Sequence, residues 1–341
     1  MCTTFPVKAK DGSVIVGRTM EFAIDLKSNI IVVPRGRDNV GTGPQELPGL
    51  QWRSRYGFVG CNVFGSELVA DGLNEVGLAM SELWLPGHTL FPDANEADAE
   101  RVLGPTEFAN WSLGNFATVA ELKAALASVK VWGAKTAELG DIPAPVHFAF
   151  HDPSGDCPVV EFVGGRVDVH DNPLGVLTNA PPFEWHVNNV RNYINLTALN
   201  VPKVELSGIE IAATGQGTGM LGLPGDYTPP SRFVRAVAFS QAAERPDHAA
   251  GAINTAWHII NTFDIFRGAV VGRNSGGETS YNITQWATVR DLTNRRMYLR
   301  TYKSMRIRMI DLTRIDFGGT EIKTIVLDQS EAFEDVTEQT A

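Results

Sequence analysis

The chain has 341 residues and is acidic, with 29 Lys and Arg against 39 Asp and Glu and a formal net charge of -10. Hydrophobic residues make up 43% of it, which is ordinary for a globular protein with a large buried core. No dense Lys/Arg block occurs, so we expect neither nucleic acid nor an anionic membrane as a partner. No run of about twenty apolar residues occurs either, so no membrane-spanning helix is expected.

The first residues lack the charged region and the following apolar region of a secretory signal peptide. The sequence as given therefore predicts a cytoplasmic protein. A periplasmic location is the alternative if a signal sequence has been removed.

The first part of the chain has the pattern of β-hairpins. Residues 3–9 and 13–20 flank an Asp-Gly pair, and residues 29–34 form a further apolar strand. Residues 67–70 and 76–81 flank a turn that we predict at Asp71 to Glu75. Residues 91–101 are polar and acidic and are predicted to form a surface loop.

Helices and strands alternate in blocks through the rest of the chain. The predicted elements are helices at 105–113 and 119–129, strands within 146–180, helices at 183–199, 230–244 and 247–262, and strands within 280–312. Such blocks indicate an α+β protein, and no linker divides it. We therefore predict a single domain over residues 1–328. Residues 329–341 are acidic with few apolar side chains, which predicts a loose tail.

The three cysteines, Cys2, Cys61 and Cys157, are too far apart in the sequence to indicate a disulfide framework or a zinc site. We expect Cys61 and Cys157 to be buried as small hydrophobic residues. The seven histidines show no metal-binding signature, and no P-loop or G-x-S-x-G elbow is present. The sequence gives no reason to expect a cofactor or a metal.

The position of Cys2 directly after the initiator methionine has a chemical consequence. A thiol becomes a good nucleophile only when it loses its proton, and its ordinary pKa is about 8.5. A terminal α-amine has a pKa of about 7.7 to 8, so part of it is free base near neutral pH. If Met1 is removed, Cys2 carries both groups, and its amine can accept the proton of its own thiol.

Several further segments support this hypothesis. They are MCTT at 1–4, GRTMEF at 17–22, DGLNEVGL at 71–78, LTNAP at 177–181 and GLPGDYTPPSRF at 222–233. In this order and at these spacings they resemble the choloylglycine hydrolase family, which includes penicillin V acylases and bile salt hydrolases. The resemblance covers residues 2 to about 325. It implies the four-layer αββα sandwich of N-terminal-nucleophile hydrolases, a homotetramer, and a small-molecule amide as substrate.

The resemblance also implies roles for particular residues. Cys2 matches the nucleophile, and Arg18 matches an arginine beside it whose charge favours the thiolate. Glu21 stands where the family usually has an aspartate that contacts the amine of the nucleophile, so this chain departs from the pattern by one methylene. Asn179 matches the asparagine whose side chain donates to the oxyanion. Arg232 matches a second active-site arginine, with Arg235 as the nearby alternative.

The other oxyanion donor of the family is a backbone N–H, which falls at Trp84 in this sequence. Phe22, Phe58, Phe64 and Trp84 lie in segments expected to border the pocket, so an apolar acyl group is predicted. An aromatic residue at position 84 resembles penicillin acylases and favours a penicillin V acylase-like activity. Bile salt hydrolysis and N-acyl homoserine lactone hydrolysis are the alternatives. A non-catalytic binding protein on the same fold is the alternative from a different class.

One further motif has a competing interpretation. Residues 217–222 fit the G-x-G-x-x-G pattern of dinucleotide-binding loops. That site requires a helix that begins within the motif, whereas here Leu-Pro-Gly-Asp follows and the next helix is expected only after Pro230. We therefore predict a flexible loop near the active site.

Overall fold

The computed structural model describes residues 1–273, 276–327, 330, 333–335 and 337. Among these residues, the two largest sheets have five and eight strands. The first sheet is ordered β1 (Cys2–Lys8), β2 (Val14–Phe22), β20 (Ile283–Asp291), β21 (Arg296–Thr301) and β22 (Arg308–Asp311). The second is ordered β15 (Arg166–Asp171), β14 (Pro158–Val163), β13 (Val146–His151), β8 (Ala79–Trp84), β7 (Val69–Asn74), β6 (Phe58–Asn62), β3 (Ile30–Val33) and β23 (Lys323–Ile325).

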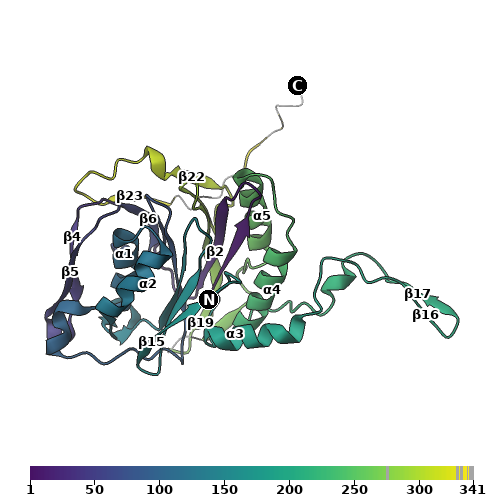
Figure 1. Cartoon of the computed structure of the whole chain (residues 1–341), viewed down its shortest axis with the longest axis horizontal. Coiled ribbons are helices and arrows are strands. Elements are labelled where there is room, and N and C mark those ends of the chain that lie inside the picture. Colours follow the sequence, from purple (N-terminus) through teal and green to yellow (C-terminus); the bar gives the residue numbers. More distant parts are fainter. Residues whose placement is uncertain (274–275, 328–329, 331–332, 336, 338–341) are drawn as a thin grey trace.

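Helices cover the outer faces of both sheets (Figure 1). The helices are α1 (Pro105–Asn115), α2 (Val119–Ala125), α3 (Phe183–Val190), α4 (Pro229–Ala242) and α5 (Ala249–Asn261). Helices α4 and α5 pack on the first sheet, and α1 packs on the second. The predicted α+β architecture, a four-layer αββα sandwich, is therefore confirmed.

Two apolar cores hold these layers together. One contains residues of α4, α5 and both sheets, and the other lies between the second sheet and the α1 and α2 layer. In β14 the neighbours Val159 and Val160 belong to opposite cores, because successive strand residues point to opposite faces. The second sheet is thus buried on both sides.

The remaining described elements are short and lie outside these layers. They are the strand pairs β4 (Asp38–Thr42) with β5 (Pro48–Arg53), β9 (Val102–Leu103) with β10 (Lys130–Val131), β11 (Lys135–Thr136) with β12 (Ile142–Pro143), β16 (Val204–Leu206) with β17 (Ile209–Ile211), and β18 (Val271–Arg273) with β19 (Thr279–Tyr281). The 3-10 turns are η1 (Pro44–Glu46), η2 (Glu96–Arg101), η3 (Leu126–Ser128), η4 (Ala137–Leu139), η5 (Arg191–Tyr193), η6 (Thr218–Met220) and η7 (Leu312–Arg314). The β16–β17 hairpin projects far from the body (Figure 1).

The first hairpin forms as predicted and sets the geometry of the N-terminus. Its turn is closed by the Asp11 side chain, which accepts from the Ser13 N–H at 2.9 Å, and by Gly12 at a φ of 88°. The register places Cys2 opposite Met20 at the end of the sheet. Arg18 follows two residues nearer the turn, so it emerges from the same face of β2 as Met20.

The predicted turn at Asp71 to Glu75 is wrong by about three residues. Strand β7 continues to Asn74, and the turn follows it. The Asn74 side chain accepts from the Val76 and Leu78 N–H groups at 3.2 and 2.9 Å, and Gly77 has a φ of 107°. Asp71 stays within the strand because its carboxylate is buried against arginines of the first sheet.

Several other boundaries differ from the prediction. The loop at 91–101 contains η2, which is closed by a capping box between Asn95 and Asp98. The helix expected to reach residue 199 ends at Val190 and is followed by η5. The strands expected to reach residue 180 end at Asp171, beyond which the structure shows an isolated bridge from Leu177 to Thr4.

The G-x-G-x-x-G segment contains η6, and α4 begins only at Pro229. The helix that a dinucleotide-binding loop requires is therefore not found at this place among the described residues. Most of the predicted tail at 329–341 lies outside the described residues. Within the part that is described, no helix combines the length and apolar composition needed to cross a bilayer.

Candidate active site

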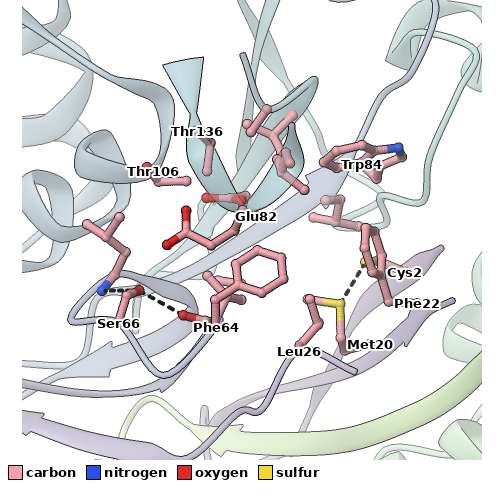
Figure 2. Close-up of a pocket in the computed structure, with 18 residues that line it drawn as sticks. Cys2, Met20, Phe22, Leu26, Phe64, Ser66, Glu82, Trp84, Thr106 and Thr136 are labelled. Atoms are coloured by element: carbon pink, nitrogen blue, oxygen red, sulfur yellow. Dashed lines mark hydrogen bonds between the residues drawn. The ribbon is translucent and has the colours of Figure 1, made fainter. Parts of the chain in front are cut away.

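A largely apolar pocket lies where the ends of β1 and β2 in the first sheet meet the end of β8 in the second. Cys2, Met20 and Phe22 reach it from the first sheet, and Trp84 reaches it from β8 (Figure 2). The rings of Phe22 and Trp84 meet edge to face at 5.5 Å between centroids. The hairpin therefore places the Cys2 thiol at an aromatic-lined cavity.

Cys2 is 2% exposed, and its thiol has two close neighbours. The Sγ lies 3.7 Å from Arg18 Nη2 and 3.6 Å from Met20 Sδ. The fully buried guanidinium of Arg18 also lies over the Trp286 ring, 5.0 Å from its centroid. The structure thus places a fixed positive charge next to the Cys2 sulfur.

A buried ion cluster holds Arg18 in this position. Its Nε lies 3.7 Å from Asp71, and its Nη2 donates to the carbonyl of Glu82. Asp71 also pairs with Arg290 at 2.7 Å, and all three charged side chains are fully buried. Two guanidinium groups share one carboxylate, so the cluster keeps a net positive charge next to the thiol. Sequence reasoning missed Asp71 and Arg290, because only the packing of the two sheets brings them to Arg18.

The side chain of Asn179 joins β1 to the second sheet. Its Oδ1 accepts from the backbone N–H of Cys2 and from Arg232 Nη2, both at 2.7 Å. Its Nδ2 donates to the carbonyl of Trp84 at 2.8 Å. Two donors on one side and an acceptor on the other fix the orientation of the amide. Among the residues that the structure describes, Nδ2 has no second acceptor, so its other N–H can reach a ligand.

The backbone N–H and carbonyl of Trp84 lie on the side of β8 that faces the Asn179 side chain. Leu85, the next residue, donates its N–H to the Pro145 carbonyl at 2.6 Å. Hydrogen-bonded and non-hydrogen-bonded pairs alternate along an antiparallel ladder, so the N–H and the carbonyl of Trp84 both point away from β13. Because that carbonyl accepts from Asn179, the Trp84 N–H and the Asn179 amide converge on one region.

Arg232 lies at the start of α4 and closes the network from the helix side. It donates to the Cys2 carbonyl and, at 2.7 Å, to Thr3 Oγ1, besides its bond to Asn179. Burial lowers the pKa of its guanidinium, and the charge of Glu21 acts in the opposite direction. The alternative, Arg235, instead donates to the carbonyls of residues 224 and 226, so it supports the loop before α4.

Glu21 is fully buried beside this network. One carboxylate oxygen accepts from Thr284 Oγ1 at 3.1 Å, and the terminal amine of Met1 donates to the Glu21 backbone carbonyl. Burial raises the pKa of Glu21, while the positive charges of Arg232 and the terminal amine oppose the rise. The structure therefore brings this carboxyl near the terminus.

Three buried groups hold the loop that carries Asn179. His147 contacts Glu161 at 2.7 Å and the Thr178 carbonyl at 3.0 Å. His186 lies 2.7 Å from the Asn179 carbonyl and stacks on Phe233 at 4.8 Å. Burial lowers the pKa of His186 to about 4, so it is neutral near pH 7.

Phe22, Phe64 and Trp84 line the pocket as expected, but Phe58 does not. Phe58 is buried in the core that faces α1 and α2, whereas its neighbour Val59 belongs to the other core. The alternation of a β-strand thus turns Phe58 away from the site. Cys61 and Cys157 are buried as expected, and burial raises the pKa of both thiols.

Comparison with known proteins agrees with this geometry. Residues 2–325 match the family described as linear amide C-N hydrolases, choloylglycine hydrolase family. The chain is 31% identical over 333 residues to the bile salt hydrolase/transferase of Clostridium perfringens, covering 95% of this chain and 96% of that one. It is 27% identical over 326 residues to the penicillin V acylase of Pectobacterium atrosepticum, covering 91% and 80% of the two chains.

The fold matches as well. A solved structure of a C2A mutant of the conjugated bile acid hydrolase from Clostridium perfringens superposes with a TM-score of 0.86, at 29% identity and over 99% of this chain and 100% of that one. The fold and its relatives therefore define a hydrolase of the N-terminal-nucleophile type. The chain belongs to the choloylglycine hydrolase family and is an enzyme that hydrolyses linear amide C–N bonds.

Proposed function

We propose that Cys2, freed at its amine by removal of Met1, is the nucleophile of a penicillin V acylase-like amidase. The observation that carries this proposal is the Cys2 Sγ at the apolar pocket, 3.7 Å from the buried Arg18 guanidinium. The Cys2 nitrogen already lies 2.7 Å from Asn179 Oδ1. A free α-amine at that place would have a fixed acceptor, which leaves its lone pair to take the thiol proton.

The first half of the reaction forms a thioester. The Cys2 thiolate attacks the acyl carbonyl, and the negative charge that develops on its oxygen is held by the Trp84 N–H and the free Asn179 Nδ2 hydrogen. When this intermediate collapses, the C–N bond breaks. The α-ammonium returns its proton to the leaving nitrogen, so the amine departs neutral.

The second half releases the acid. Water attacks the thioester carbonyl, the α-amine accepts a water proton, and the same two donors hold the oxyanion. The C–S bond then breaks, and the acyl group leaves as a carboxylic acid while Cys2 regains its proton. The charges of Glu21 and Arg232 act in opposite directions on the terminal amine of Met1, one residue before Cys2, so we assign these two side chains to holding the freed Cys2 amine in place.

The pocket supports an apolar acyl group. Phe22, Phe64 and Trp84 surround the space beside Cys2, and the Trp84 ring favours a flat aryl acyl group such as that of penicillin V. Bile salt hydrolysis is an equally good candidate, because it is the activity named for the relative that is 31% identical. Long-chain acyl homoserine lactones are the third candidate substrate.

The experiment is a comparison of amine release from penicillin V, glycocholate, taurocholate and a long-chain acyl homoserine lactone. Wild type, Cys2→Ala and the matched control Cys157→Ala are measured together. We expect Cys2→Ala to be inactive and Cys157→Ala to remain active, since Cys157 is buried away from the pocket. Intact mass is expected to show loss of Met1 and one iodoacetamide adduct, on Cys2.

Three results would overturn the proposal. The first is a wild type that cleaves none of the four substrates, and the second is a Cys2→Ala variant as active as wild type. The third is full activity in protein whose mass shows a retained Met1, because the α-amine would then be an amide.

We also propose a homotetramer, with the β16–β17 arm as a contact between chains. The arm projects from the body and carries large apolar side chains that are mostly exposed, among them Ile194 at 84%, Leu199 at 76% and Ile209 at 65% (Figure 1). So many exposed large apolar side chains on one projecting segment favour an interaction site.

Light scattering during size-exclusion chromatography tests this assembly. Wild type is expected to elute with the mass of four chains, and Ile209→Glu with a smaller mass. The neighbouring Glu210→Gln is the matched control and should leave the mass unchanged. A monomeric wild type, or a tetramer that Ile209→Glu does not disturb, would contradict the proposal.

A further inference from the structure

The pocket contains one buried acid that the proposed mechanism does not use. Glu82 lies on β8, its side chain lines the pocket, and it is 8% exposed. Its Oε2 is buried and has no hydrogen-bond partner among the described residues. An unpartnered buried carboxyl oxygen is costly, and such a group in a binding cavity indicates a polar partner on the ligand.

Glu82 lies away from the reacting thiol. It precedes Trp84 by two residues, so both side chains emerge from the same face of β8, about 7 Å apart along the strand. In Figure 2 its carboxyl group points toward Thr106 and Thr136, and Phe64 lies on the side toward Cys2. An acyl group whose carbonyl reaches Cys2 would therefore present its far end to Glu82.

Two charged side chains, Arg18 and Glu138, lie near Glu82 or line the same pocket. Burial raises the pKa of its carboxyl to about 8, and the Arg18 guanidinium acts in the opposite direction. The other acid that lines the pocket, Glu138, lies on η4 and is exposed. Near pH 7 the Glu82 carboxyl is mainly protonated, so it offers both a donor and an acceptor.

We propose that Glu82 is a specificity-determining residue that hydrogen-bonds a neutral polar group, a hydroxyl above all, at the far end of the apolar acyl group. This inference rests on the proposed function, because it places the acyl carbonyl at Cys2. An anionic end group would meet a second carboxyl in an apolar cavity. A cationic end group would enter a site where the Arg18 cluster already carries net positive charge.

Matched anilides test this inference. The substrates are the para-nitroanilides of phenylacetic, para-hydroxyphenylacetic and para-aminomethylphenylacetic acids, which differ only at the far end of the acyl group. We measure kcat/KM for wild type, Glu82→Met, Glu82→Gln and the control Glu138→Gln. A series of amides of terminal hydroxy fatty acids then locates the chain length at which the hydroxyl preference is greatest.

We expect wild type to prefer the hydroxyl substrate over the plain one by about tenfold or more, since a site that pairs a hydroxyl rejects the analogue that lacks it. Glu82→Met should abolish or reverse this preference, while Glu82→Gln, which keeps a donor and an acceptor, and Glu138→Gln should keep it. A protein that cleaves neither the plain nor the hydroxyl anilide would overturn the proposed function as well. Cleavage without a hydroxyl preference, a preference unchanged in Glu82→Met, or a preference for the aminomethyl substrate would overturn only the role of Glu82.

Discussion

Replacing Asn179 separates its two tasks in the proposed mechanism. The amide nitrogen of Asn179 is a proposed oxyanion donor, while its oxygen accepts from Cys2 and Arg232 at 2.7 Å. Asn179→Ala removes both functions. Asn179→Asp keeps an acceptor oxygen for Cys2 and Arg232 but replaces the donor with a second oxygen. The pair of variants therefore distinguishes a catalytic effect from a structural one.

The expected magnitudes follow from these contacts. Loss of one oxyanion donor costs about 2.7–4 kcal/mol of transition-state stabilisation, or a factor of about 10²–10³ in kcat. In Asn179→Ala the buried Arg232 also loses a partner, which lowers the free energy of unfolding by about 1–3 kcal/mol. In Asn179→Asp we expect a rate loss at least as large, with a smaller loss of stability.

The assay is kcat and KM for the best substrate of the wild type, together with thermal unfolding of each variant. Asn192→Ala is the control, since Asn192 is an exposed asparagine on η5, outside the pocket. It should change neither quantity. If either Asn179 variant keeps kcat within threefold of wild type while Cys2→Ala is inactive, the oxyanion assignment is refuted.

Three further predictions concern the surroundings of the thiol. Arg18→Gln should slow iodoacetamide alkylation of Cys2 at pH 7 by about tenfold or more, because the guanidinium 3.7 Å away attracts negative charge on the attacking sulfur; an unchanged rate measured by mass spectrometry would contradict this. The pKa of Glu82 is raised to about 8 when folded, so its contribution to stability is present below the unfolded value and is lost as pH rises toward 8. Chemical denaturation should therefore show that the free energy of unfolding of Glu82→Gln rises relative to that of wild type by about 1.4 kcal/mol per pH unit between about pH 5 and 8. A difference that does not change with pH would refute this prediction. His186→Phe should lower kcat about tenfold with little change in KM, because His186 only positions the loop of Asn179; a change confined to KM would indicate direct substrate contact.

The sequence by itself determined the local features of this protein. The turn residues Asp11 and Gly12 specify the first hairpin, and that hairpin alone places Cys2 opposite Met20 and near Arg18. Apolar periodicity located the helices and most strands, because a 3.6-residue or 2-residue repeat is a property of neighbours in the chain. The spaced motifs then indicated the family and, with it, the sandwich fold.

The errors in the strand pattern have a common cause. Asp71 and Gly72 resemble a turn when only their neighbours are considered, yet Asp71 is fixed in a strand by Arg290 of the opposite sheet. Phe58 was expected at the pocket because its segment borders it. The face of β6 from which Phe58 emerges depends on the register of the whole sheet. That register directs the Phe58 side chain into the core that faces α1.

Only the tertiary structure decided how the separate parts become a site. Asn179 is 177 residues from Cys2 and Arg232 is 230 residues from it, and they meet because α4 and the second sheet pack around the end of β1. The direction of the Trp84 N–H follows from ladder alternation, and the unpartnered Oε2 of Glu82 follows from its place in a largely apolar pocket. Charge, burial and the direction of a hydrogen bond are properties of a surrounding shell, and that shell forms only when residues distant in the sequence pack together.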